Sequence, residues 1–180
     1  MQMPPKELKA ALLYQIGALD GIAMSMGVRV SHVKPHGALN NMACEDEDLA
    51  GVVAAAVREY SRDLILLAPA LSELARAGER IGLPVALEVF SDRTYTDTGQ
   101  LAPRSHPQAV LHDSEACVSQ VQRMVERGGI VSINGKFLPT PFHSVCVHGD
   151  NQDAAATARR VKQGLEAVGC SILTLPEVLL

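Results

Sequence analysis

Hydrophobic positions along the chain recur at two spacings, which predict helices alternating with strands. A first helix begins at Pro4 and Pro5, which suit an initial turn, and ends at Gly27. Its apolar side recurs at helical spacing and consists of Leu8, Leu12, Ile16, Leu19, Ala23 and Met26. Further helices are expected over residues 46–60, 71–81, 114–127 and 153–168.

Short apolar runs between these helices predict the strands. The expected strands cover Val28–Val33, Leu64–Ala68, Val85–Phe90, Ser144–Val147 and Ser171–Thr174. A hairpin is expected from Ile130–Ile133 and Lys136–Leu138, around a type I′ turn at Asn134-Gly135. Several runs are apolar throughout, which is typical of strands buried on both faces of a parallel sheet. We therefore expect an α/β fold.

Polar residues lie at the ends of three expected strands, those ending at Val33, Phe90 and Val147. The side chains concerned are Lys34, His36, Glu88, Asp92, Arg93, His148 and Asp150. In parallel α/β folds the carboxyl ends of the strands meet at one rim, where ligands bind. The sequence therefore predicts a polar site at this rim.

The chemistry of these side chains suits acid–base catalysis and anion binding. His36, His148 and Asp150 are candidate general acids or bases or, less favoured, metal ligands. The alternative for each histidine is bonding to loop backbone. Lys34 suits an oxyanion or a carboxylate. A long polar segment without periodicity, Ser91–Pro107, contains Arg93 near its start and Arg104 near its end. Both arginines suit bidentate binding of a substrate carboxylate. The alternative for both arginines is a salt bridge that orders this segment.

The composition narrows the class of partner. A length of 180 residues favours one domain, and the net charge of −4 argues against a nucleic-acid-binding surface. Aromatic residues make up only 3% of the chain, so the core is expected to be aliphatic. No run reaches the roughly 18 apolar residues that a membrane span needs. We expect a cytoplasmic protein.

Sequence motifs for nucleotides, metals and nucleophiles are missing. The cysteines, Cys44, Cys117, Cys146 and Cys170, form no C-x-x-C pair, and we expect them to be reduced and mostly buried. The chain has no G-x-G string. Gly129–Lys136 is one residue too long for a P-loop, and a hairpin explains it better. No ATP site is therefore predicted within this chain.

Five sequence strings occur in order along nearly the whole chain. They are LLYQIGAL (Leu12–Leu19), HVKPHGAL (His32–Leu39), EVFSDRTY (Glu88–Tyr95), APRSHPQAVLHD (Ala102–Asp113) and CVHGD (Cys146–Asp150). This set resembles the LamB/YcsF family, the A subunit of ATP-dependent 5-oxoprolinase. The combination of HVKPHGAL with EVFSDRTY is specific.

The resemblance implies a (β/α) barrel of the glycoside hydrolase/deacetylase type and a hydrolase that acts on a cyclic amide. Together with B and C subunits, such a protein opens 5-oxo-L-proline to L-glutamate with hydrolysis of ATP, which enters through the complex. The implied acid–base residues are His36, Asp92 and His148. The implied substrate-binding residues are Lys34, Arg93, Arg104, Asp150 and Glu88, and no metal is assigned.

The chain departs from the family pattern in two places. Asn40 replaces the usual Tyr of the K-P-H-G-A-L-Y-N string, and the family's amino-terminal strings are not found. We therefore expect residues 1–180 to form one domain that corresponds to the carboxyl-terminal two thirds of a typical member, with an incomplete barrel. The alternatives are a non-catalytic or degenerate fragment that serves as an assembly partner, or a deacetylase-like carbohydrate hydrolase.

An incomplete barrel has consequences for association. A sheet that does not close has unpaired edges, and its inner face lacks an opposing wall. Strand Leu64–Ala68 is therefore expected to expose apolar surface. We expect association with a second copy or with a complementing chain.

Overall fold

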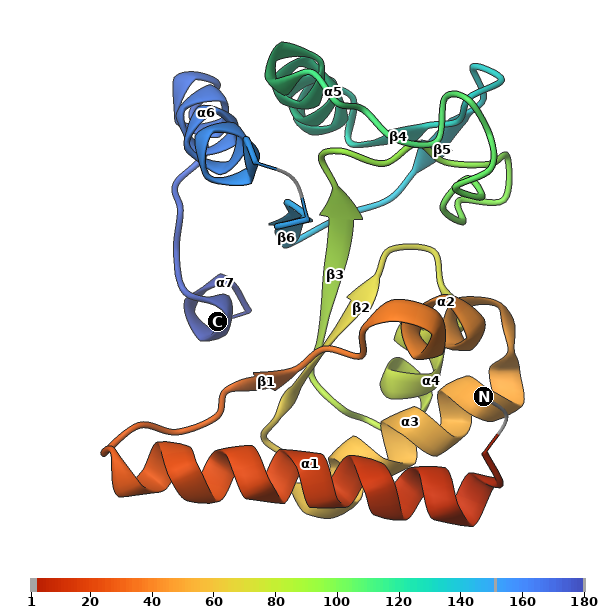
Figure 1. Cartoon of the computed structure of the whole chain (residues 1–180), viewed down its shortest axis with the longest axis vertical. Helices are drawn as coiled ribbons and strands as arrows, with labels where there is room; N and C mark the ends of the chain where they lie inside the picture. The colour runs from red at the N-terminus through yellow and green to blue at the C-terminus, as the bar shows by residue number, and fades with distance from the viewer. Residues whose placement is uncertain (1–2, 151, 180) are drawn as a thin grey trace. The chain divides into compact units, whose positions relative to one another are not determined.

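The computed structural model describes residues 3–150 and 152–179. It contains two compact units, one running up to Leu87 and resuming at Leu175, the other covering Glu88–Thr174. The helices in Figure 1 are α1 (Pro5–Ser25), α2 (Gly37–Glu45), α3 (Glu47–Tyr60), α4 (Glu73–Arg80), α5 (Ser114–Arg127), α6 (Ala154–Ala167) and α7 (Leu175–Val178). The strands are β1 (His32–Val33), β2 (Ile65–Pro69), β3 (Val85–Phe90), β4 (Gly129–Val131), β5 (Phe137–Pro139) and β6 (Ser144–Cys146).

The main sheet has the strand order β1-β2-β3-β6. Strand β1 pairs in parallel with β2, with His32 opposite Ile65. Strand β3 pairs in parallel with β6, with Phe90 opposite Cys146. Among the described residues β1 and β6 are edges, so the sheet does not close on itself. The α/β fold with an incomplete barrel is confirmed.

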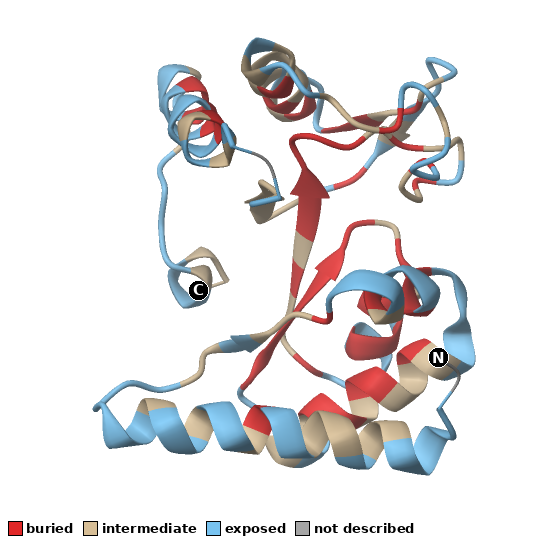
Figure 2. Cartoon of the chain, viewed as in Figure 1, coloured by how far each residue is buried: buried red, intermediate tan, exposed pale blue. Residues whose placement is uncertain are grey.

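The core of the first unit lies between the sheet and helices α3 and α4. Every residue of β2 is buried, and Val53, Val57 and Leu74 pack in the same cluster as Leu66. Figure 2 shows this burial on β2 and on the inner sides of α3 and α4. Helix α4 approaches the sheet closely because Gly78 has no side chain, and a Cβ there would lie 2.8 Å from side-chain atoms of two sheet residues.

The opposite face of β2 is covered by the end of the chain. Ile65, Leu67 and Ala86 form a second buried cluster, against which Leu175 and Leu179 pack. The expectation that strand Leu64–Ala68 exposes apolar surface is therefore wrong. Residues 171–174, expected to form a strand, form none and are exposed.

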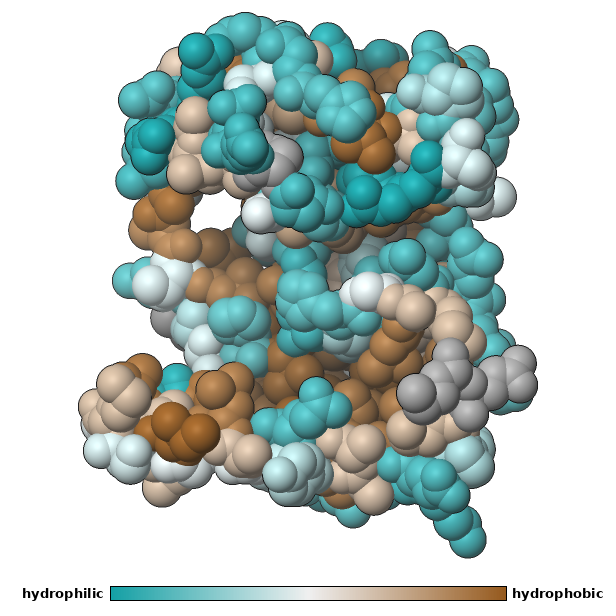
Figure 3. Space-filling view, viewed as in Figure 1, coloured by the Kyte–Doolittle hydropathy of each residue, from teal (hydrophilic) through white to brown (hydrophobic). Residues whose placement is uncertain are grey.

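Helix α1 forms as predicted, but part of its apolar stripe is uncovered. Ile16 is buried and Leu12 packs against the same core, whereas Leu19 and Met26 are 59% and 75% exposed. Ile22 is also exposed, and Figure 3 shows hydrophobic surface over the carboxyl-terminal half of α1. The stripe marks a helix correctly, but only its first half packs.

The second unit is held together by α5, α6 and β6. Cys117, Val121, Val161 and Leu165 are buried together, with Val145 of β6 against them. Helix α5 has the boundaries predicted for it. The Asp113 carboxylate caps it by accepting a hydrogen bond from the backbone N–H of Ala116 at 3.0 Å, and Gly128 ends it with a φ of 66°. Acidic N-caps and left-handed glycine C-caps are the usual helix boundaries.

The predicted hairpin is present as the antiparallel pair β4–β5. Its turn is not type I′, because that turn needs a positive φ at Asn134, which this residue does not have. Instead Gly135 N–H donates to the Ser132 carbonyl, and of the two turn residues only Gly135 has a positive φ, of 84°. The Gly129–Lys136 segment is thus a hairpin, as predicted, and not a phosphate-binding loop.

Strand β1 is shorter than predicted, and one helix was missed. Strand β1 covers only His32–Val33, because the ladder with β2 pairs only these two residues. Helix α2 was not predicted at all. Its sequence contains Asn40 and Asn41, which are poor helix formers, and its buried apolar residues Ala43 and Cys44 are few.

Candidate functional site

Asp92 and His148 form a hydrogen-bonded pair of side chains in the second unit. The Nδ1 atom of His148 lies 2.9 Å from Oδ1 and 2.8 Å from Oδ2 of Asp92. A carboxylate only accepts hydrogen bonds, so Nδ1 carries the proton and donates it. The neutral ring therefore has its lone pair on Nε2, the tautomer that a general base uses.

The strand ends position both side chains. Asp92 follows β3 and His148 follows β6, two strands that pair in parallel. The ring of His148 stacks on that of Phe90, with centroids 5.7 Å apart and planes 16° from parallel. The stack and the carboxylate together fix the orientation of the imidazole.

The turn that carries Asp92 is clamped from two sides. Ser91 is fully buried, and both its N–H and its hydroxyl donate to the carbonyl of Cys146, at 3.0 and 2.9 Å. From α5, Nε2 of Gln120 donates to the carbonyl oxygens of Phe90, Ser91 and Arg93, at 3.0, 3.0 and 2.9 Å. Three carbonyls around Asp92 thus face one donor group.

Two further polar residues of the second unit, Tyr95 and Glu88, are buried. Tyr95 is 4% exposed, and its hydroxyl oxygen accepts a hydrogen bond from the N–H of Phe90 at 2.7 Å. Burial raises the pKa of Tyr95, and the negative charges of Glu88 and Asp92 add to this. Glu88 is itself only 3% exposed. It therefore lies in the interior of the site, away from the solvent-exposed rim.

Arg93 holds the polar segment in place. It is 5% exposed, its Nε donates to the carbonyl of Ala109 and its Nη2 to that of Ala102, at 3.1 and 2.7 Å. Burial, together with the charge of nearby Arg104, lowers the pKa of Arg93. These contacts order the polar segment. The alternative expected for Arg93 was this ordering role through a salt bridge, whereas the structure shows it through backbone carbonyls. They do not point to a substrate clamp.

The exposed rim of the site carries Arg104 and Asp150. Nη2 of Arg104 lies 3.4 Å from Oδ2 of Asp150, and both side chains are more than half exposed. Exposed pairs of this kind contribute little to stability. Both groups are therefore available for a charged ligand.

The remaining predicted residues belong to the first unit. Lys34 and His36 follow β1, and His36 is the residue before α2. Asn40, which replaces the family's Tyr, is 6% exposed and its Oδ1 has no hydrogen-bond partner within the described residues. The structure thus brings together Asp92, Arg93, Arg104, His148 and Asp150 in one unit, while the participation of Lys34 and His36 stays a prediction.

Sequence reasoning missed the supporting residues. Phe90 and Tyr95 lie inside the EVFSDRTY string, which was the available signal. Gln120 has no such signal, because its contacts are to backbone carbonyls. Within the described residues, no three His, Cys, Asp or Glu side chains are arranged to hold a metal ion. All four cysteines are free, Cys44 and Cys117 being buried.

An open α/β sheet with an oriented histidine and a carboxylate at its strand ends is suited to acid–base chemistry. The model of the LamB/YcsF family matches residues 1–180, and the chain belongs to this family. No described helix is both long enough and apolar enough to cross a membrane.

Relatives and a solved structure agree with this assignment. The chain is 56% identical to the 5-oxoprolinase A subunit of Azoarcus sp. (strain BH72), covering 99% of this chain and 70% of that protein. It is 43% identical to the 5-oxoprolinase A subunit of Bacillus subtilis (strain 168), covering 98% and 69%. The crystal structure of a lactam utilization protein from Thermus thermophilus matches with a TM-score of 0.87 at 35% identity, covering 96% of this chain and 68% of that one.

Proposed function

We propose that the chain acts as the A subunit of an ATP-dependent 5-oxoprolinase. Together with B and C subunits, it would cleave 5-oxo-L-proline to L-glutamate, coupled to hydrolysis of ATP. The observation that carries the proposal is the Asp92–His148 pair at the strand ends. The names of relatives with up to 56% identity support the choice of substrate.

The geometry suggests how a lactam is opened. His148 accepts a proton from water at Nε2, and the water oxygen attacks the ring carbonyl carbon. The ring C–N bond then breaks, and the protonated histidine returns the proton to the leaving nitrogen. Asp92 keeps the imidazole in the required tautomer and stabilises its charged form.

Other residues bind and position the substrate. Arg104 is an exposed cation beside Asp150 at the rim and suits the substrate carboxylate. From its sequence position alone, we propose that Lys34 stabilises negative charge that develops in the reaction. Arg93 shapes the site through the segment that it holds.

We propose that the assembled complex, rather than this chain alone, binds and uses ATP. A lactam is unreactive, so phosphorylation of its oxygen by ATP, with release of ADP, would make the carbon susceptible to attack. Attack by water and cleavage of the ring C–N bond would then leave an acyl phosphate, and a second water would release phosphate to give the carboxylate. The P-loop-like stretch of this chain forms the β4–β5 hairpin. We therefore assign no step with ATP to its residues and expect negligible 5-oxoproline-dependent ATP hydrolysis by the chain alone.

We also propose that the chain associates with another polypeptide chain. The exposed Leu19 and Ile22 of α1, with Met26 directly after the helix, offer apolar surface to a second copy, a complementing chain or one of the other subunits. Nothing in the composition favours nucleic acid as a partner. A cytoplasmic location accords with the free cysteines.

The test is reconstitution of the chain with B and C subunits and measurement of glutamate and ADP. His148→Ala is expected to lower kcat by roughly 10²–10⁴-fold. His112→Ala, which removes an exposed histidine of the same unit, serves as the control and is expected to leave kcat unchanged. Full activity of His148→Ala would refute the role of the pair, and an assembly that forms no glutamate would refute the assigned reaction.

A further inference from the structure

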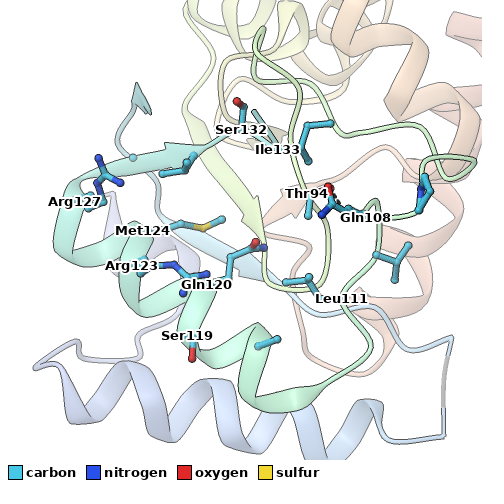
Figure 4. Close-up of a pocket in the computed structure, with 15 residues that line it drawn as sticks. Thr94, Gln108, Leu111, Ser119, Gln120, Arg123, Met124, Arg127, Ser132 and Ile133 are labelled. Atoms are coloured by element: carbon cyan, nitrogen blue, oxygen red, sulfur yellow. Dashed lines mark hydrogen bonds between the residues drawn. The ribbon is translucent and has the colours of Figure 1, made fainter. Parts of the chain in front are cut away.

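A second concave site of the second unit lies between α5, the polar segment and the β4–β5 hairpin. It has a volume of about 890 Å³, within the range of roughly 300–1,000 Å³ typical of small-molecule sites. Figure 4 shows the side chains that line it. Asp92, His148, Arg104 and Asp150 are not among its lining residues.

The charge of this pocket is one-sided. Arg123 and Arg127 are the ionisable residues that line it, and no Asp or Glu does, although the chain as a whole has a net charge of −4. The arginines are four residues apart and therefore lie on the same side of α5. Glu126, between them in sequence, is not part of the lining.

The two arginines are held differently. The guanidinium carbon of Arg127 lies 4.9 Å from the ring centroid of Phe137, so a cation–π contact with β5 positions it. Arg123 has no hydrogen bond or ion pair with any described residue. Figure 4 shows it beside Gln120 on α5. Its donors are therefore available to a ligand.

The rest of the lining is mixed. Leu111, Met124, Val131 and Ile133 supply apolar surface, and the hydroxyl of Ser119 is a further polar group without a partner among the described residues. Such a pocket suits a ligand with an apolar body and an anionic end. Arginine binds carboxylates and phosphates alike through paired N–H donors.

We propose that this pocket binds a small organic anion, a carboxylate or phosphate ester with an apolar portion, anchored by Arg123. Gln120, which lines the pocket, also donates to the carbonyls around Asp92, so the bound anion lies next to the turn that carries Asp92. The site is separate from the proposed catalytic one and does not depend on the proposed reaction.

The test is a titration of the isotope-labelled full chain followed by amide NMR shifts. The probes are phenyl phosphate, phenylacetate, inorganic phosphate and, as an uncharged match, benzyl alcohol. We expect phenyl phosphate or phenylacetate to shift amides of residues 119–124 and 131–133. Inorganic phosphate should bind more weakly and benzyl alcohol should leave these amides unmoved. The better of the two aromatic anions identifies the anionic group, and either one supports the proposal.

Variants distinguish a built site from general charge attraction. Arg123→Gln is expected to weaken binding about ten- to a hundredfold. Arg159→Gln removes an exposed arginine from α6 and is expected to change nothing. Equal loss in both variants, unchanged binding in Arg123→Gln, or no shift with either aromatic anion would overturn the proposal. Because the readout is binding, these outcomes are independent of whether the chain acts as a 5-oxoprolinase.

Discussion

Gln120 holds the turn that carries Asp92 from the side of α5, and replacing this side chain tests the architecture of the site. Gln120→Met keeps the length and the apolar contacts of the side chain but removes its amide. The two N–H groups of Nε2 serve three carbonyl oxygens at 2.9 to 3.0 Å. Each net hydrogen bond contributes about 0.5–1.5 kcal/mol, and a buried acceptor left without a donor costs about 1–3 kcal/mol. We expect the free energy of unfolding of the second unit to fall by about 2–3 kcal/mol.

Gln122→Met is the matched control on the same helix. Nε2 of Gln122 makes one hydrogen bond, to the carbonyl of Gly164 at 3.1 Å, so its loss is expected to cost about 1 kcal/mol. Native-state amide exchange of α5 and β6 measures the opening free energy of this unit directly. If Gln120→Met costs no more than Gln122→Met, the three-carbonyl clamp does not support the turn.

Further substitutions test the packing and the titration of buried groups. Gly129→Ala places a Cβ into the backbone of β5 and is expected to destabilise the hairpin by more than about 1 kcal/mol, whereas Gly51→Ala, in open space on α3, is expected to gain about 1 kcal/mol in urea unfolding. Burial raises the pKa of the Cys44 and Cys117 thiols to about 11. The folded protein therefore keeps both thiol protons above pH 9, where the unfolded chain loses them, and stability falls as pH rises from about 9 to 11. Disulfide reagents at about pH 8 should leave both unlabelled, and rapid labelling would contradict this. Asn40→Leu removes a buried carbonyl oxygen without a partner, together with a long 3.5 Å hydrogen bond from Nδ2 to Asn41, and is expected to raise stability by about 1 kcal/mol in urea unfolding. A loss of stability would contradict this.

The elements that sequence predicted best are those with local boundary signals. Helices α3 and α5 begin after Asp46 and Asp113, whose carboxylates accept hydrogen bonds from the first turn. Ser171–Thr174 failed because β-forming residues do not make a strand without a neighbouring strand to pair with. The apolar stripe of α1 failed in its second half for a related reason. Periodicity identifies the apolar side of a helix, but only the tertiary structure shows whether another element covers it.

The candidate site, too, could be predicted from the sequence only in part. Asp92 and His148 could be predicted to approach each other, because the rule for carboxyl ends of parallel strands depends only on strand order. The contacts of Arg93 could not, since they need the polar segment to fold back so that the carbonyls of Ala102 and Ala109 reach the guanidinium. Backbone acceptors have no sequence pattern.

A double-mutant cycle tests which predicted residues act together. Asp92 acts through the tautomer of His148, so in the reconstituted enzyme Asp92→Asn and His148→Ala are expected to be strongly non-additive. Once the histidine is gone, the second substitution should lower kcat by less than about threefold. His36 lies in the other unit, and His36→Ala is informative in either direction. If it lowers kcat by the roughly 10²–10⁴-fold expected of an acid–base group and its effect persists on top of His148→Ala, it performs a separate proton transfer. Unchanged kcat in His36→Ala would make it a structural histidine. Full additivity of Asp92→Asn with His148→Ala would show that the 2.8 Å contact plays no part in the reaction.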